Sequence, residues 1–285
     1  MKKLGSIALV LCATLTASAQ GKFEVKEFGS FKLHSYITAD PLGDMSYIIE
    51  GNKSVVVLEP AAFHDNIKEL GEYLGKLNKP VEKVIANYHA AGFSAFDHSK
   101  FVMIEGMPQF VKGDVYSGMM ANFATTFGNK MDISQFTPSV TVSKDAKENW
   151  AGVEFKFSPG ASSDFPAASI LIGGKVYYTH FTPVANMHMS ALQITSLEAV
   201  DAQLAGLEHA KASGATTFIG GHGGATASAE AVNFQIEYLK KVKETRLQIQ
   251  TGDEFVLVMQ MTYPDIAGEE NLTAVATNLY KKLKI

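Results

Sequence analysis

The sequence has a single cysteine, Cys12, and it lies in an apolar N-terminal segment. Residues 1–19 combine two lysines, an apolar run and the small-x-small site Ala17-Ser18-Ala19, which is the pattern of a secretory signal peptide. Cleavage there would leave residues 20–285 without any thiol. We therefore expect an exported protein, periplasmic or secreted, that has no disulfide, no cysteine nucleophile and no thiolate metal ligand.

Charge of either sign is scarce in the chain. Charged residues make up 19% of it, and the formal net charge is −4 at pH 7. Nucleic acids and anionic membrane surfaces attract basic faces, so we expect neither partner. After residue 19 no apolar run reaches the ~20 residues that a membrane-spanning helix needs. These patterns leave the oligomeric state and the identity of any other partner open.

Proline-rich linkers and low-complexity stretches are also missing, and the nine prolines are spread along the chain. We therefore expect residues 20–285 to form one domain. Alternating or β-branched segments predict strands, and apolar residues at helical spacing predict helices. The predicted strands are 23–27, 32–38, 45–50, 54–58, 81–86, 101–104, 140–142, 153–157, 169–172, 175–179 and 216–219, and the predicted helices are 64–77, 115–127, 193–212, 228–250, 253–261 and 269–284. Two series of strands, each followed by helices, predict an α+β fold, an αββα four-layer sandwich.

Three of the eight histidines stand at the ends of predicted strands. They are His89, His180 and His222. Strand ends that open onto one edge of a sheet are where α/β proteins build sites. Three neutral imidazoles together with a water molecule can complete a tetrahedral zinc site. These three histidines are therefore the predicted metal ligands.

The order and spacing of the segments resemble the metallo-β-lactamase fold superfamily over nearly all of residues 20–285. Met45–Gly51 (MSYIIEG) and Val55–Pro60 (VVVLEP) are similar to the family's opening hairpin, with its SYLI-G and VLID patterns. Gly221-His222-Gly223 is similar to the GHG loop that carries the family's last metal-binding histidine. The resemblance implies the αββα sandwich and descent from hydrolases that activate water on one or two metal ions.

Most of the family's other metal ligands are replaced. Its H-x-H-x-D-H motif falls on residues 87–92 (NYHAAG), where only the second histidine is kept, as His89. Its T-P-G-H loop falls on residues 158–161, where Ala161 replaces the histidine, and its bridging aspartate falls on Thr179-His180. Alanine and glycine side chains offer no donor atom. The resemblance therefore implies a divergent member that cannot assemble the usual two-metal site, and the usual mechanism is not expected.

Two functions remain open at this point. In the first, the protein is a divergent hydrolase in which His89, His180 and His222 hold one divalent ion, zinc being the best match, and act on an unknown small substrate. In the second, it is a catalytically inactive pseudoenzyme whose former active-site cleft binds a small molecule or a partner. The sequence assigns no catalytic residue in either case.

Two considerations suggest which residues line the cleft. The resemblance applies to those at the motif positions, and nearness in sequence to the Pro159-Gly160 loop and to His180 applies to Asp164 and His188. We expect Asn87, Tyr88, Ala161, Asp164 and His188 to lie there. A group of methionines leaves a further choice, because they either pack in the core or form the wall of an adaptable apolar pocket. They are Met103, Met107, Met119, Met120, Met131, Met187 and Met189.

Overall fold

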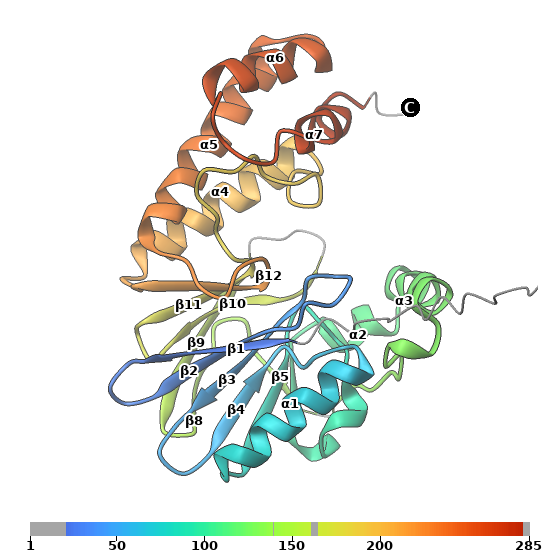
Figure 1. Ribbon diagram of the computed structural model, residues 1–285, viewed down its shortest axis with the longest axis vertical. Helices are drawn as coiled ribbons and strands as arrows, with labels where there is room; N and C mark the ends of the chain where they lie inside the picture. The colour runs from blue at the N-terminus through green and yellow to red at the C-terminus, as the bar shows by residue number, and fades with distance from the viewer. Residues whose placement is uncertain (1–20, 139, 161–164, 282–285) are drawn as a thin grey trace, which may run out of the picture.

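Two β-sheets lie face to face at the centre of the molecule, and helices cover the outer face of each sheet (Figure 1). This computed structural model describes residues 21–138, 140–160 and 165–281. The expected signal peptide, residues 1–19, lies outside the described residues. The four layers confirm the predicted α+β fold, an αββα sandwich.

The first sheet has its seven strands in sequence order. They are β1 (Lys22–Glu27), β2 (Lys32–Ile37), β3 (Met45–Glu50), β4 (Val55–Leu58), β5 (Val81–Ala86), β6 (Phe101–Ile104) and β7 (Thr141–Val142). Neighbours from β1 to β4 are antiparallel, and those from β4 to β7 are parallel. A parallel strand needs apolar side chains on both faces. In β4, Val56 and Leu58 face the core between the sheets, whereas Val55 and Val57 pack under the outer helices.

The second sheet has five strands in the order β12-β11-β10-β9-β8. They are β8 (Lys147–Trp150), β9 (Val153–Pro159), β10 (Ala168–Ile172), β11 (Val176–Phe181) and β12 (Thr217–His222). Strand β9 shows the alternation of a half-buried strand, because Val153, Phe155 and Phe157 enter the core between the sheets and the residues between them are exposed. Strand β8 was not predicted, since its sequence KENW has no apolar alternation and it forms only by pairing with β9.

Of the described helices, three lie on the side of the first sheet and four on the side of the second. The first group is α1 (His64–Leu77), α2 (Met107–Val111) and α3 (Asp114–Phe127), and the second is α4 (Leu197–Ala212), α5 (Ala229–Gln248), α6 (Gly252–Thr262) and α7 (Asn271–Tyr280). Helices α6 and α7 lie at the end of the molecule away from the sheets (Figure 1). Helix α4 begins later than predicted because Ser196 caps it and accepts a hydrogen bond from the amide of Ala199 at 3.2 Å.

Single-turn 3-10 helices connect the remaining segments of the first half. They are Phe93–Ala95, His98–Lys100 and Gly128–Lys130. Across the described ranges, none of the helices combines the length and apolar composition that crossing a bilayer requires.

Candidate functional site

Three strand ends meet at one edge of the sandwich. His89 follows β5 of the first sheet, while His180 in β11 and His222 at the end of β12 belong to neighbouring parallel strands of the second sheet. One ring nitrogen from each of these histidines lies within 4.8 Å of the other two. The Nε2 atoms of His89 and His222 are 3.0 Å apart. The predicted convergence of the three histidines is therefore present in the structure.

A glycine in the β12 strand makes this approach feasible. A Cβ atom added to Gly221 would lie 2.8 Å from Cε1 of His89 and 3.1 Å from the hydroxyl oxygen of Tyr178. Gly220 is crowded in the same way, since its Cβ would lie 2.1 Å from the backbone nitrogen of Thr182. Gly221 is thus explained by the approach of the His89 ring from the first sheet, and Gly220 by the close approach of the backbone at the end of the neighbouring strand β11.

A buried aspartate beside the first sheet lies next to His222. Oδ1 of Asp44 lies 3.2 Å from Nδ1 of His222, and a β-bridge joins the two residues across the sandwich. Asp44 is only 6% exposed. Burial raises the pKa of Asp44 to about 7, and the nearby Asp40 raises it further while His222 lowers it. Oδ1 of Asp44 accepts no hydrogen bond, so its contact with His222 is electrostatic, and the backbone of Leu42 is the hydrogen-bond partner of the His222 ring.

A second buried carboxylate holds the loop that carries His89. Glu59 is fully buried and accepts hydrogen bonds from three successive backbone amides, those of Asn87 at 3.3 Å, Tyr88 at 2.8 Å and His89 at 3.0 Å. The hydroxyl of Tyr178 donates to the same carboxylate. Glu59 thus ties the end of β5 to β11, and it fixes the backbone position from which the His89 ring enters the cluster.

Burial favours the neutral form of two of the three imidazoles. It lowers the pKa of His180 well below 6.5, and His89 and His222 lower it further. Burial and His89 also lower the pKa of His222, against a smaller opposing effect of Asp44. The ring of His180 stacks on that of Tyr88, with 4.2 Å between centroids. A neutral imidazole has a free lone pair, so this environment suits metal ligation.

The histidines form one end of a cavity of about 340 Å³. Apart from the histidines, Asp44 and tyrosine hydroxyls, its walls are apolar. They comprise Leu42, Ala62, Tyr88, Ala90, Ala91, Tyr116, Met119, Met120, Phe123, Met131, Phe165, Phe181 and Leu192. The volume is at the lower end of the ~300–1,000 Å³ that is usual for ligand pockets. A small, largely apolar molecule fits such a space.

Asn87 does not line this cavity, contrary to the expectation from the sequence. Its side chain is fully buried and bridges β5 to β10, with Nδ2 donating to the carbonyl of Ala168 at 2.7 Å and Oδ1 accepting from the amide of Ala168 at 2.9 Å. Both ends of the amide are therefore used within the sheet packing. Tyr88, the next residue, does line the cavity as expected.

His188 is the second correction. It is 1% exposed and lies in the C-terminal helical layer, where Nδ1 contacts the hydroxyl of Tyr238 at 3.0 Å. The chain turns away from the site after β11, so nearness in sequence to His180 did not mean nearness in space. The two other expected cleft residues, Ala161 and Asp164, lie outside the described residues.

The methionines divide between pocket and core. Met119, Met120 and Met131 line the cavity. Met103 and Met107 are fully buried under the first sheet, and Met189 packs in the C-terminal helical layer. Met187 is 39% exposed and is not a lining residue. Some of these methionines therefore line the apolar pocket, and others pack in the core.

The donor atoms fit one metal ion. Among the described residues, the three histidines form the one group of three or more potential ligand side chains whose donor atoms lie close together. Each contributes one ring nitrogen. A second ion would need further donors nearby. Asn87 is bonded to the backbone of Ala168, and Ala90, Ala91 and Gly92 have no donor group in their side chains. The described site therefore suits a single three-histidine centre rather than a pair of ions.

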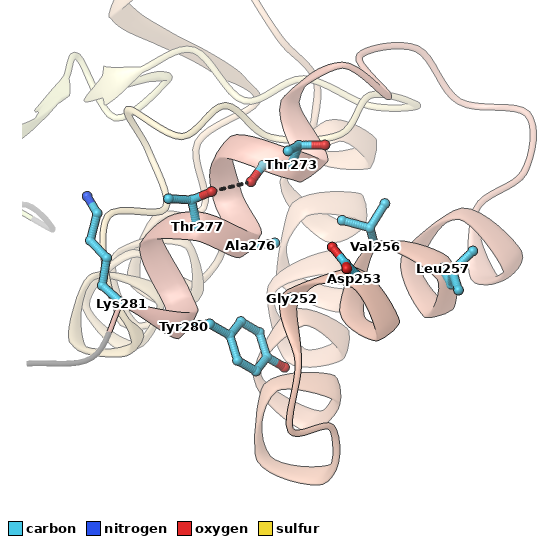
Figure 2. Close-up of a pocket in the computed structure, with 9 residues that line it drawn as sticks. All are labelled: Gly252, Asp253, Val256, Leu257, Thr273, Ala276, Thr277, Tyr280 and Lys281. Atoms are coloured by element: carbon cyan, nitrogen blue, oxygen red, sulfur yellow. Dashed lines mark hydrogen bonds between the residues drawn. The ribbon is translucent and has the colours of Figure 1, made fainter.

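A larger cavity of about 560 Å³ lies between α6 and α7, where Figure 2 shows Ala276 and Tyr280 beside Gly252 and Val256. It shares no lining residue with the histidine cavity. Its lining contains no histidine, and the hydroxyl of Thr277 already donates to the carbonyl of Thr273 within α7. The histidine cavity is therefore the candidate functional site.

Comparison with known proteins agrees with this architecture. No protein-family model and no curated protein sequence matches the chain. A metallo-beta-lactamase family protein from Thermus thermophilus has a TM-score of 0.57 at 14% identity, over 89% of this chain and 93% of that one. An archaeal metallo-beta-lactamase superfamily protein from Sulfolobus tokodaii has a TM-score of 0.53 at 13% identity, over 85% and 97% of the two chains.

A third similar structure is the stereoselective inverting sec-alkylsulfatase Pisa1 from Pseudomonas sp. Its TM-score is 0.61 at 14% identity, and the match covers 91% of this chain but 50% of the sulfatase. At such identities the likeness concerns the fold. Together with the two sheets, their helical layers and the histidines at their common edge, these matches show that the chain has the metallo-β-lactamase fold.

Proposed function

We propose that the protein is an exported, divergent hydrolase that binds one divalent cation, with zinc as the best match, and cleaves a small substrate held in the adjoining cavity. The observation that carries the proposal is the convergence of His89, His180 and His222 within 4.8 Å at the end of an apolar cavity. The N-terminal pattern of residues 1–19 supports the export part of the proposal. The names of similar structures, a metallo-β-lactamase family protein and a sulfatase, support hydrolase ancestry.

A bound divalent ion would act as a Lewis acid and lower the pKa of a coordinated water toward neutrality. The chain's own residues position the histidines and exclude bulk water from the site. Asp44 places a carboxylate 3.2 Å from Nδ1 of His222, and Glu59 holds the His89 backbone. The apolar side chains around the histidines exclude bulk water, which strengthens the electrostatic interactions within the site.

The pseudoenzyme remains the second candidate, and one observation favours it. The 3.0 Å between Nε2 of His89 and Nε2 of His222 is a hydrogen-bond distance, so the two rings satisfy each other without an ion. The family's first histidine position, Asn87, has also become part of the sheet packing. In this case the cavity binds a small molecule without chemical change.

Metal content separates the two candidates. Residues 20–285 would be expressed without a histidine tag and measured by plasma mass spectrometry as wild type, His89→Ala and His222→Ala. His64→Ala is the matched control, because His64 is exposed at the start of α1 and outside the cavity. We expect about one metal per chain in wild type and control, and loss of it in both site variants. A metal-free wild type after growth with zinc would contradict the hydrolase proposal and favour the binding protein.

A further inference from the structure

One face of helix α3 forms part of the cavity wall. Tyr116, Met119, Met120 and Phe123 recur at the spacing of a single helical face, and all four line the cavity. The hydroxyl of Tyr116 donates to the carbonyl of Ala90, so the cavity receives mainly its aromatic ring. This face therefore offers thioether and aromatic surface, which adapts to alkyl chains of varied shape.

Charge is nearly absent from the cavity. Among the described lining residues there is no lysine or arginine, and Asp44 is the one carboxylate. Apart from the tyrosines, the titratable groups of the described lining are Asp44 and the three histidines. They come from strand ends and not from the α3 face. A ligand group that lies against α3 would thus have no cationic partner, and an anion buried there would be desolvated without compensation.

The geometry points to a neutral carboxylic ester with an apolar acyl chain as the substrate class, the ester group lying at the histidines and the chain against α3. This inference rests on the proposed hydrolase function. In the reaction, a water molecule adds to the acyl carbonyl, the acyl C–O bond breaks, and the alcohol leaves with a proton from the water. The carboxylic acid that forms ionises, and its proton passes to solvent.

Two esters of the same length test the charge preference. Methyl octanoate and monomethyl suberate present the same methyl ester and differ at the far end, which is a methyl group in one and a carboxylate in the other. Each is titrated into the purified protein labelled with [methyl-¹³C]methionine. The NMR signals of Met119, Met120 and Met131, assigned by substitution, report binding in the cavity, and the signal of released methanol reports hydrolysis in the same sample.

We expect methyl octanoate to shift these signals and monomethyl suberate to bind at least tenfold more weakly. Shortening methyl octanoate to methyl hexanoate removes two methylenes and should weaken binding on the order of tenfold. Equal or tighter binding of monomethyl suberate, or no shift with either ester, would overturn the inference. Binding of methyl octanoate without release of methanol would support the ligand class and refute the hydrolase function. Release of methanol without a preference for methyl octanoate over monomethyl suberate would support the hydrolase function and refute the ligand class.

A charge placed in the wall provides a matched variant. Met119→Lys puts an ammonium group on the lining face of α3, and Ala121→Lys puts the same group on its exposed side. We expect Met119→Lys to bring monomethyl suberate binding to at least the level of methyl octanoate, and Ala121→Lys to keep the wild-type preference. The same response from both variants would contradict the placement of the chain against α3. The wild-type comparison decides the charge preference even where Met119→Lys folds poorly.

Discussion

The backbone amide of His89 donates a hydrogen bond of 3.0 Å to Oε2 of Glu59, a carboxylate with no exposed surface. The same carboxylate accepts from the amides of the two preceding residues and from Tyr178. Because these donors belong to β11 and to the loop after β5, one side chain couples the two sheets directly below the histidine cluster. The position of a candidate ligand thus depends on a residue that is not itself a candidate ligand.

Glu59→Ala should therefore unfold the site as well as destabilise the chain. It leaves several buried donors without an acceptor, and we expect a loss of at least ~3 kcal/mol in the free energy of unfolding. Urea denaturation measures this loss. Glu72→Ala is the control, since Glu72 is exposed and pairs with Lys68 at 3.8 Å; its effect should stay within ~0.5 kcal/mol. Equal stabilities of the two variants would show that the amides find other partners.

Asp44→Asn should weaken metal binding while the fold persists. The carboxylate lies 3.2 Å from Nδ1 of His222, where its charge favours a cation bound at the histidines, and loss of such partners costs ~10–100-fold in metal affinity. Competition with a fluorescent zinc chelator measures the change. Asp65→Asn, at an exposed position in the first turn of α1, is the control and should leave the affinity unchanged. An unchanged affinity in Asp44→Asn would remove Asp44 from the site.

Two glycines of the same loop should respond differently to one added methyl group. In Gly221→Ala the new Cβ would lie 2.8 Å from the His89 ring, so we expect strain of ~1–3 kcal/mol and weaker metal binding. In Gly224→Ala nothing lies within 4 Å of the new Cβ, and we expect wild-type behaviour. Thermal melts and the zinc competition assay check both variants. A silent Gly221→Ala would mean that the His89 ring has room to move.

The three histidines could be predicted from the sequence because the signal for each is local. A β-branched or alternating segment predicts a strand, and His89, His180 and His222 stand at the ends of such segments. The layers of the fold follow from the same patterns, since strands and helices appear in two series. Strand β8 and helix α2 escaped prediction because neither KENW nor the short MPQFV segment has a clear periodicity.

The residues around the histidines could not be predicted in the same way. Asp44 follows a glycine between two predicted strands, a pattern typical of a turn, and its contact with His222 arises only when the two sheets stack. Glu59 stands at the end of β4, and nothing in its neighbours indicates that three amides converge on it. Whether Asn87 faces the cavity or β10 depends on where the backbone groups of Ala168 lie. These are contacts between distant segments, which a single sequence does not encode locally.

Stability should depend on pH through His188, which lies away from the site. Burial lowers the pKa of His188 below 6.5, and Glu269 and Glu270 offset only part of this effect. Below pH 6.5 the unfolded chain binds a proton at His188 that the folded chain does not, so folding loses free energy as the pH falls. The glutamine side chain in His188→Gln does not titrate in this pH range. The stability advantage of wild type over His188→Gln should be largest above pH 7 and shrink toward pH 5, as measured by urea denaturation at each pH. A constant difference across that range would contradict the assignment.

Restoring the family's first motif histidine should fail to restore a second metal site. In Asn87→His the donor and acceptor nitrogens of the imidazole point in divergent directions, so they cannot both reach the carbonyl and the amide of Ala168, as the side-chain amide of Asn87 does at 2.7 and 2.9 Å. The buried space also has to take a larger ring, so we expect a loss of at least ~2 kcal/mol in stability. The metal content should stay at or below the wild-type value, because Ala91 and Gly92 supply no further donor. Plasma mass spectrometry and thermal melts measure both quantities. A stable variant that gains a second ion per chain would show that Asn87 can turn toward the cavity and that the lost site is still latent in the fold.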